Sequence, residues 1–260
     1  DIVLPPDIHP DAARSASWLG PLRNSDAFIH VIRAFEAEHV FHIMGDTDPA
    51  RDIEIVDIEL LLADLALVET RLERMAKERL SRGSDPSKAR EQAVIERCRD
   101  HLETEQPLRL LELSEEDSKV VRSLQFLTIK PLVAVFNVGE DFQHERQALV
   151  GLETKLAGQG ITAVFLSAVI EGELVELAAE DQAAFMADLG LHEPAAHRLS
   201  RAAYDALGLL SLFTVGPDEV RAWPVRRGAS APEAAGRIHS DLQRGFIRAD
   251  TIAYDDLIGA

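Results

Sequence analysis

The longest periodic pattern in the chain predicts a pair of long helices. From Ile53 onward, apolar residues recur every three or four positions for about thirty residues, up to a turn-forming segment at 83–86. A second stretch, from Ala89 to Leu102, repeats this spacing. Two helices of this length joined by a tight turn cover each other's apolar stripes as an antiparallel hairpin. The pattern therefore predicts an inserted helical arm.

Three short apolar runs predict the strands of a sheet. The first, FIHVIRAF at 28–35, precedes a turn-rich loop at 38–49. The other two, LVAVF at 132–136 and ITAVFL at 161–166, have the continuous apolar character of buried parallel strands. A helical pattern at 145–156 separates them. Strand, helix and strand in this order predict a right-handed βαβ unit in a doubly wound, mostly parallel sheet, and hence an α/β fold.

Shorter helices are predicted elsewhere. Ser114 and Asp117 have the spacing of an N-cap and its hydrogen-bond partner, so a helix is expected to begin after Ser114. Two further helices are predicted near Glu173–Leu189 and Ala195–Leu207. These last two connect the predicted sheet to the C-terminal part of the chain.

The segment 221–251 combines a strand pattern, a helix-start signal and basic residues. Ser230 and Glu233 form an S-x-x-E capping box, and the helix is expected to stop at Gly245 and to pack on strands on either side of it. Between residues 220 and 249 there are two acidic residues and six arginines, namely Arg221, Arg226, Arg227, Arg237, Arg244 and Arg248. Positive charge is therefore concentrated in this segment.

Composition limits the class of protein. The chain has 260 residues and is 46% hydrophobic, so it is long and apolar enough to bury a core and to form two or three domains. Its formal net charge is −18. No apolar run approaches the roughly 18 residues that cross a bilayer, and no signal segment opens the chain, so we expect a soluble cytoplasmic protein without membrane contact. The acidic balance disfavours broad coating of nucleic acid, so any RNA contact is expected to be local. A single cysteine, Cys98, is expected to be a buried structural thiol.

The segment 221–251 also resembles a known family. It is similar to the C-terminal TGS module of the YchF subfamily of Obg-like P-loop NTPases, in which R-A-W leads through G-A-x-A-P-x-A-A-G-x-I-H-x-D to G-F-I-R-A. The resemblance covers essentially the whole chain from about Asp26 onward. It implies a P-loop NTPase-type sheet with an inserted helical coiled-coil hairpin and a C-terminal β-grasp (TGS) module.

The resemblance also implies a division into domains. Residues 1–50 and 126–205 correspond to a nucleotide-binding G-type domain, 51–125 to the inserted hairpin and 206–260 to the TGS domain. The phosphate-binding motif G-x-x-x-x-G-K-[ST] does not occur in the chain. We expect the P-loop segment and the last TGS strands to lie outside these 260 residues. A divergent member that has lost the P-loop is the alternative, which we disfavour because it would expose a sheet edge and apolar helix faces.

Ligands of open parallel sheets bind beyond the carboxyl ends of the strands. At these positions the family has a base-recognition segment that reads N-x-x-E, where most GTPases have N-K-x-D, and a short S-A loop that closes over the base. The corresponding residues are Asn137, Val138, Glu140, Ser167 and Ala168. An isolated N-x-x-E is more often a capped turn with a solvated glutamate, but the preceding strand and the long resemblance favour base recognition. Glutamate in place of aspartate moves the carboxylate away from the two guanine donors, so we expect relaxed specificity, and the resemblance implies that ATP is accepted at least as well as GTP.

His42 is the candidate catalytic residue. It lies in the loop after FIHVIRAF, where the family carries a histidine proposed to help place the attacking water. A neutral imidazole accepts a hydrogen bond from water near pH 7. A solvated loop histidine is the alternative, and both interpretations stay open because His39 is only three residues away. The sequence contains no metal-ligand motif, and the resemblance implies Mg²⁺ held by residues outside the chain.

The resemblance implies a monomer that binds and hydrolyses ATP, GTP or both and associates with the ribosome or ribosomal RNA. Hydrolysis would proceed by in-line attack of water on the γ-phosphate. The candidate RNA or ribosome contacts are Arg226, Arg227, Arg237, Arg244 and Arg248, although these residues also fit solvated loop charges. The alternative functions are a non-hydrolysing adaptor that holds RNA or protein through the arm and the TGS surface, and a guanine-specific GTPase.

Overall fold

The computed structural model describes residues 2–4, 19–37, 39–82, 86–216 and 218–259. The chain forms two compact units, Asp1–Ala203 and Tyr204–Ala260. In the described part of the chain, no helix has the length and apolar character needed to cross a membrane.

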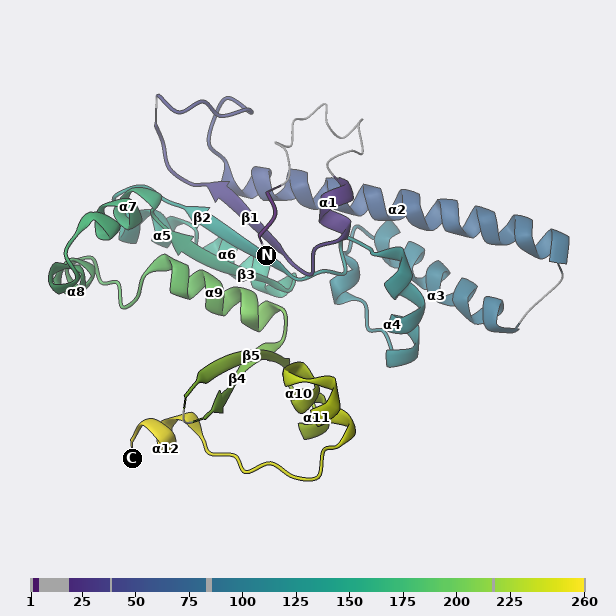
Figure 1. Ribbon diagram of the computed structural model, residues 1–260. Helices are drawn as coiled ribbons and strands as arrows, with labels where there is room; N and C mark the ends of the chain where they lie inside the picture. The colour runs from purple at the N-terminus through teal and green to yellow at the C-terminus, as the bar shows by residue number, and fades with distance from the viewer. Residues whose placement is uncertain (1, 5–18, 38, 83–85, 217, 260) are drawn as a thin grey trace. The chain divides into compact units, whose positions relative to one another are not determined.

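A three-stranded parallel sheet lies at the centre of the first unit (Figure 1). Its strands are β1 (Phe28–Arg33), β2 (Leu132–Asn137) and β3 (Ile161–Leu166), in the order β1-β2-β3. The middle strand is buried along all but its last residue, as its continuous apolar run predicts. The predicted α/β class and parallel sheet are therefore confirmed.

The register of the strands aligns their carboxyl ends. Arg33 lies opposite Asn137, and Asn137 lies opposite Leu166. The Phe136 and Phe165 rings stack with their centroids 5.2 Å apart, one residue before this edge. The loops that follow the three strands consequently leave the sheet from one edge.

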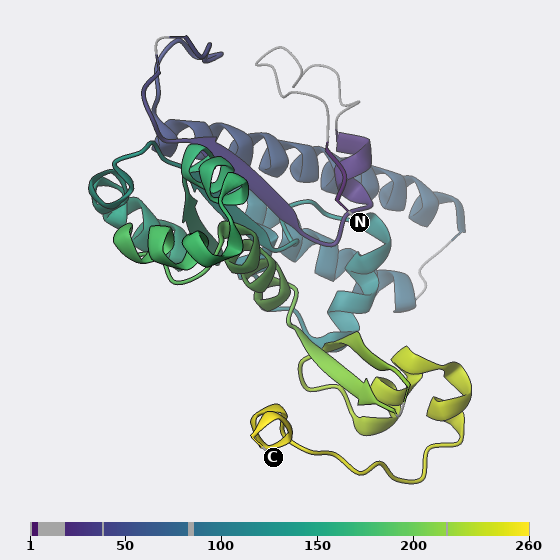
Figure 2. The ribbon, with the colours of Figure 1, turned by 60° about the vertical axis from the view of Figure 1, so that its left-hand side comes forward.

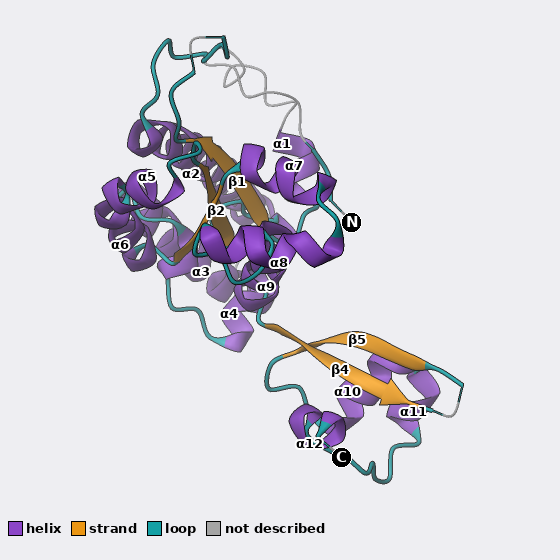
Figure 3. Ribbon diagram, turned by 90° about the vertical axis from the view of Figure 1, so that its left-hand side faces the viewer, coloured by secondary structure: helices purple, strands orange, loops and turns teal. Residues whose placement is uncertain are grey.

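Helices cover this sheet (Figure 3). Those outside the arm are α1 (Leu19–Arg23), α5 (Phe142–Ala148), α6 (Val150–Gly158), α7 (Ala168–Glu176), α8 (Ala179–Asp188) and α9 (Ala195–Ala206). The helix expected at 145–156 is in fact two helices, because Leu149 leaves helical geometry at φ −97° and ψ 0° while its side chain packs against the sheet core.

The helix expected at 173–189 also differs from the prediction. α7 begins earlier, at Ala168, where Ser167 is the N-cap and its Oγ accepts a hydrogen bond from the Ile170 N–H at 3.5 Å. Leu177 and Ala178 are extended and separate α7 from α8. A helix-period pattern alone does not reveal such a break, because apolar positions continue through it.

The predicted arm is formed by α2 (Pro49–Arg82) and α3 (Pro86–Glu103), which lie side by side (Figure 1). α2 begins four residues earlier than the apolar pattern indicates, because the Asp48 carboxylate caps it and Pro49 occupies its first position. The N-terminal part of α2 also packs on the sheet, since Ile53 belongs to the same buried cluster as β1.

A second apolar cluster holds the outer part of the arm. It joins α2 and α3 to three short helices, namely η3 (Leu108–Leu110), α4 (Glu115–Val121) and η4 (Arg122–Leu124). Ser114 caps α4 as predicted, since its side chain accepts from the Asp117 N–H at 3.1 Å. Cys98 is fully buried in this cluster, and burial raises the pKa of its thiol to about 11, in line with the expected structural role.

The second unit pairs β4 (Leu209–Val215) with β5 (Val220–Arg226) in an antiparallel hairpin. Three helices follow, namely α10 (Ala231–Ile238), α11 (Ser240–Arg244) and α12 (Tyr254–Ile258). The predicted capping box is present at the start of α10, where the Glu233 carboxylate accepts from the Ser230 N–H at 2.8 Å.

The single helix expected to end at Gly245 is broken at His239. This residue is extended, at φ −160° and ψ 141°, and its Nδ1 accepts from the Asp241 N–H, which caps α11. α10 packs against β5, but the described residues after α11 form no strand. The expectation of strands on both sides of the helix was therefore wrong.

Candidate functional site

The loops at the carboxyl edge of the sheet carry the candidate residues of the first unit. Backbone hydrogen bonds continue past the strands, from the Ala34 N–H to the Asn137 carbonyl and from the Val138 N–H to the Leu166 carbonyl, both at 2.8 Å. The loop between β1 and α2 stands at this edge (Figure 2). His42 lies on that loop.

The side chain of Asn137 connects two of these loops. Its Oδ1 accepts a hydrogen bond from the Ala168 N–H at 2.9 Å. Ser167 is buried and caps α7. The Asn137 side chain and the Ser167 cap together fix the start of the loop that follows β3. The structure therefore brings Asn137, Ser167 and Ala168 together.

The other two candidates at this edge differ in exposure. Val138 is buried in the core, and its backbone N–H donates to the Leu166 carbonyl, so the structure does not present this residue to a ligand. Glu140 is exposed at the surface. The Glu140 carboxylate is therefore accessible to a nucleotide base bound at the carboxyl end of the sheet. The Val138 side chain contributes packing.

Glu145 shapes the loop after β2, a role that the sequence did not indicate. Its carboxylate accepts a hydrogen bond from the Gly139 N–H. A Cβ at position 139 would lie 2.8 Å from Glu145 Oε1, so a larger residue there would displace the Glu145 carboxylate from the Gly139 N–H. The loop between Asn137 and α5 is thus held by one side chain of the following helix.

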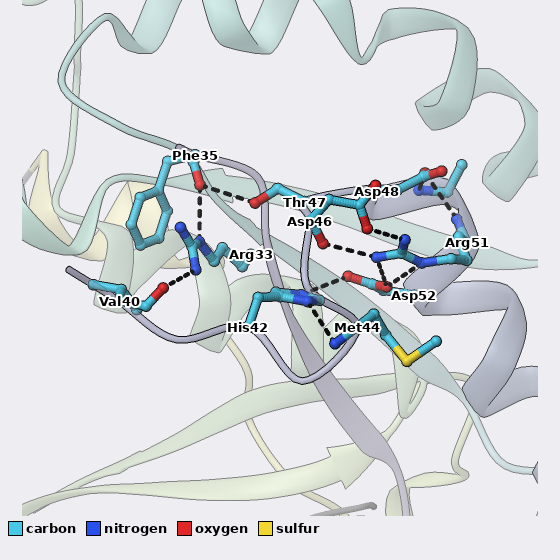
Figure 4. Close-up of polar contacts among 11 residues, drawn as sticks. Arg33, Phe35, Val40, His42, Met44, Asp46, Thr47, Asp48, Arg51 and Asp52 are labelled. Atoms are coloured by element: carbon cyan, nitrogen blue, oxygen red, sulfur yellow. Dashed lines mark hydrogen bonds and ion pairs between the residues drawn. The ribbon is translucent and has the colours of Figure 1, made fainter. Parts of the chain in front are cut away.

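Arg33, the last residue of β1, organises the loop that carries His42 (Figure 4). Its guanidinium donates to three backbone carbonyls, those of Phe35 at 2.9 Å, Ala37 at 3.1 Å and Val40 at 2.8 Å. It also lies over the Phe35 ring, 4.8 Å from the centroid. One cation thereby fixes the path of the loop as it leaves the sheet.

His42 is held in place by two contacts. Its Nε2 lies 2.9 Å from Asp52 Oδ2, and its Nδ1 accepts from the Met44 N–H at 3.2 Å. The His42 side chain is only 14% exposed. Figure 4 shows the imidazole between the loop backbone and the carboxylate of α2.

Arg51 holds the acidic residues around this histidine. Its Nε and Nη2 donate to Asp52 Oδ1 at 3.0 and 2.9 Å, and its Nη1 donates to Asp46 Oδ1 at 2.5 Å. The hydrogen bond from Arg51 keeps the pKa of Asp46 below its ordinary value. A cavity of about 410 Å³ lies beside this network, lined in part by Arg33, His42 and Thr47. The lining of the cavity therefore includes a cationic side chain, Arg33, and an anionic one, Asp46.

His30 lies in β1 near Asp52. Burial lowers its pKa from 6.5 to about 4, and the Asp52 carboxylate acts in the opposite direction. Its Nδ1 is buried and finds no hydrogen-bond partner within the described residues. His30 is therefore neutral in the folded protein at neutral pH.

The lowered pKa of the partly buried His30 predicts a loss of stability in acid. Between pH 6.5 and pH 4 the unfolded chain binds a proton that folded His30 does not, so the free energy of unfolding falls as the pH drops through this window. The shift corresponds to about 3 kcal/mol. Urea unfolding of the protein and of His30→Leu, followed by circular dichroism at pH 7.5 and pH 4, measures the difference. His144 is exposed, so His144→Leu is the control and should keep the pH dependence of the unmodified protein. If His30→Leu also kept that pH dependence, the lowered pKa would not belong to His30.

The basic candidates lie in the second unit, and all five are exposed. Arg227 pairs with Asp205 at 3.0 Å, Arg244 pairs with Asp241, and Arg237 donates to the Pro224 carbonyl at 3.1 Å. Arg221 was counted among the arginines of this segment but not among the candidate contacts, and its guanidinium lies over the Trp223 ring, 4.5 Å from the centroid. The segment therefore presents cations and an aromatic ring, although acidic neighbours offset part of the charge.

Comparisons with known proteins identify relatives of the chain. A family model named YchF-GTPase_C, described as a protein of unknown function (DUF933), matches residues 209–260. The chain is 39% identical over 244 residues to the "Ribosome-binding ATPase YchF" of Bacillus subtilis (strain 168) and 41% identical over 241 residues to the protein of that name from Escherichia coli O157:H7. Each alignment covers 93% of this chain and 66% of the relative.

A curated relative and a solved structure, both from Schizosaccharomyces pombe, extend the comparison. The "Obg-like ATPase 1" of Schizosaccharomyces pombe is 34% identical over 250 residues, which cover 93% of this chain and 63% of that protein. The solved structure titled "Structure of the Schizosaccharomyces pombe YchF GTPase" superposes with a TM-score of 0.77 at 34% identity and covers 88% of this chain and 63% of the other. The chain thus spans just under two thirds of the length of these relatives.

Proposed function

The chain belongs to the YchF family, and on that premise we propose that the intact protein binds and hydrolyses ATP, GTP or both, with less preference for GTP than a typical GTPase, and associates with the ribosome in the cytoplasm as a monomer. The observation that carries the proposal is the hydrogen bond between Asn137 and Ala168, which joins the N-x-x-E segment to the S-A loop at the carboxyl edge of the sheet. This is the edge at which open parallel sheets bind their ligands.

The proposed base contact follows from this geometry. With its Oδ1 held by the Ala168 N–H, the Asn137 side chain has a fixed orientation toward the loop that would cover the base. Glu140 is exposed beside it and supplies a carboxylate to an exocyclic amino group. Because adenine offers a donor next to an acceptor and guanine offers two adjacent donors, a carboxylate one methylene further out is less selective for guanine.

The described residues do not by themselves fit Mg²⁺. They contain no group of three histidine, cysteine or acidic side chains able to hold a metal ion. We propose that the Mg²⁺ typical of such hydrolases is held by nucleotide phosphates and by residues outside this set. The cation would neutralise phosphate charge when bound.

We also propose the division of labour among the domains. Residues 1–50 and 126–205 would bind the nucleotide, residues 51–125 would form the helical hairpin, and residues 206–260 would form a TGS domain that contacts ribosomal RNA through exposed arginines. The compact unit Tyr204–Ala260 supports the last boundary. The exposed Arg226 and Arg248 and the Arg221–Trp223 stack support the proposed contact, since cations bind phosphates and rings stack on bases.

Isothermal titration of the intact protein with ATP, GTP and non-hydrolysable analogues in the presence of Mg²⁺ tests the nucleotide proposal. Asn137→Ala is expected to raise the Kd for ATP by about tenfold or more, because it removes a polar base contact and the partner of the Ala168 N–H. Gln147→Ala, which removes an exposed amide from α5, is the matched control and should bind as the unmodified protein does. No binding at millimolar nucleotide would refute the proposal and favour an adaptor that holds RNA or protein.

A further inference from the structure

We propose that Asp52 is a positioning residue for hydrolysis, which fixes the tautomer of His42 so that Nδ1 carries the lone pair that orients the attacking water. The inference rests on the proposed nucleotide hydrolysis and adds a residue of α2 to that site. Two independent contacts of the imidazole carry it.

The two contacts select the same tautomer. An ionised carboxylate only accepts hydrogen bonds, so the 2.9 Å contact between Asp52 Oδ2 and His42 Nε2 places the ring proton on Nε2. The Met44 N–H only donates, so its 3.2 Å contact requires a lone pair on Nδ1. Neither contact fits a neutral ring protonated on Nδ1.

Asp52 is itself rigidly placed. Arg51 occupies its Oδ1 through two donors and leaves Oδ2 for the histidine. Asp52 lies in the first turn of α2, directly before Ile53, which is buried in the core that α2 shares with the sheet. A residue on a long, packed helix therefore orients a residue on a loop, which is how precise sites are commonly supported.

The Met44 contact marks where the water acts. It joins residues two apart in the chain and is exposed, whereas the Asp52 contact is largely shielded from solvent. A water that replaces the Met44 N–H donates one proton to Nδ1, and its oxygen attacks the γ-phosphorus. The bond from that phosphorus to the bridging oxygen breaks, the nucleoside diphosphate leaves, and the water proton passes to Nδ1. Asp52 stabilises the resulting imidazolium until the proton is released to solvent.

Asp52→Asn in the intact protein tests the inference through two readouts. Long-range ¹H–¹⁵N correlation spectra should show the Nε2–H tautomer of His42 in the unmodified protein and a loss of that preference in Asp52→Asn. The variant is expected to lower kcat by about 10- to 100-fold with nucleotide affinity nearly unchanged. In a His42→Ala background the same substitution should have no further effect on kcat, because Asp52 acts through the histidine.

Controls separate this role from a structural one. Glu54→Gln removes an exposed carboxylate from the same helix and should leave tautomer and kcat unchanged. Asp52→Glu keeps a carboxylate acceptor and should retain the Nε2–H form, which guards against misfolding of the amide variant. Retention of the Nε2–H tautomer in Asp52→Asn, or an equal loss of kcat in the His42→Ala background, would overturn the inference. If the intact protein hydrolyses no nucleotide, the proposed function fails, and the tautomer spectra still decide whether Asp52 sets the state of His42.

Discussion

Asp64→Ala is expected to lower the free energy of unfolding of the first unit by about 3–5 kcal/mol. Asp64 lies on α2, and its side chain is fully buried. It accepts three hydrogen bonds, from the Leu127 N–H at 2.9 Å, the Thr128 N–H at 2.7 Å and the Thr128 hydroxyl at 2.8 Å. Alanine leaves two buried backbone donors without partners, which costs far more than a typical surface change because each keeps its full desolvation penalty.

Removal of the buried Asp64 carboxylate also relieves its desolvation cost, which offsets part of this loss. Burial raises the pKa of its carboxyl group, and the hydrogen bonds from Leu127 and Thr128 oppose that shift. Urea unfolding followed by circular dichroism at neutral pH measures the effect. Glu69→Ala removes an exposed carboxylate from the same helix and should change stability by no more than about 0.5 kcal/mol. A loss below about 1 kcal/mol in Asp64→Ala would show that water or a local shift satisfies the donors.

Asp64 also illustrates why the sequence predicted elements better than the contacts between them. The arm follows from helical periodicity and strands β1, β2 and β3 follow from short apolar runs, and both signals are local in the sequence. The partners of Asp64 are backbone groups 63 and 64 residues away. Lys130 likewise donates to the carbonyls of Leu22, Arg23 and Ser25, more than one hundred residues earlier. A side chain that bonds to distant backbone leaves no spacing to recognise.

Helix breaks were missed for a related reason. Leu149 and His239 interrupt helices whose apolar positions continue in register on both sides. At Leu149 the break turns the chain from α5 into α6 while the side chain stays in the sheet core, so tertiary packing overrides local propensity. At His239 the ring supplies the cap of the next helix, a role more often taken by serine, threonine or aspartate.

The candidate site was predictable where strand order determines it. Parallel pairing of β2 with β3 places Asn137 beside the residues that follow Leu166, and the hydrogen bond to Ala168 completes that juxtaposition. The surroundings of His42 were not predictable, because the Arg33 clamp and the Asp52 contact link a loop to elements before and after it. The resemblance to a family pointed to His42, and the structure adds the groups that hold it.

His42→Ala in the intact protein is expected to lower kcat for nucleotide hydrolysis by about 10²- to 10⁴-fold, the range associated with a positioned general base or proton acceptor. The Kd for a non-hydrolysable nucleotide should stay nearly unchanged, because His42 lies on the loop after β1, whereas the proposed base contacts follow β2 and β3. Single-turnover measurements separate the chemical step from product release.

A second histidine in the same loop supplies the matched control. His39 is exposed three residues away, so His39→Ala removes an imidazole from the loop without removing the one that Asp52 holds. It should hydrolyse nucleotide at nearly the normal rate. An equal loss in both variants would indicate that the loop tolerates no change and that neither ring has a specific role. A loss confined to His39→Ala would move the catalytic assignment to that residue, and full activity in His42→Ala would leave water orientation to backbone or phosphate groups. Only a large loss confined to His42→Ala agrees with an imidazole that is shielded, held in one tautomer and aimed by a carboxylate on a rigid helix.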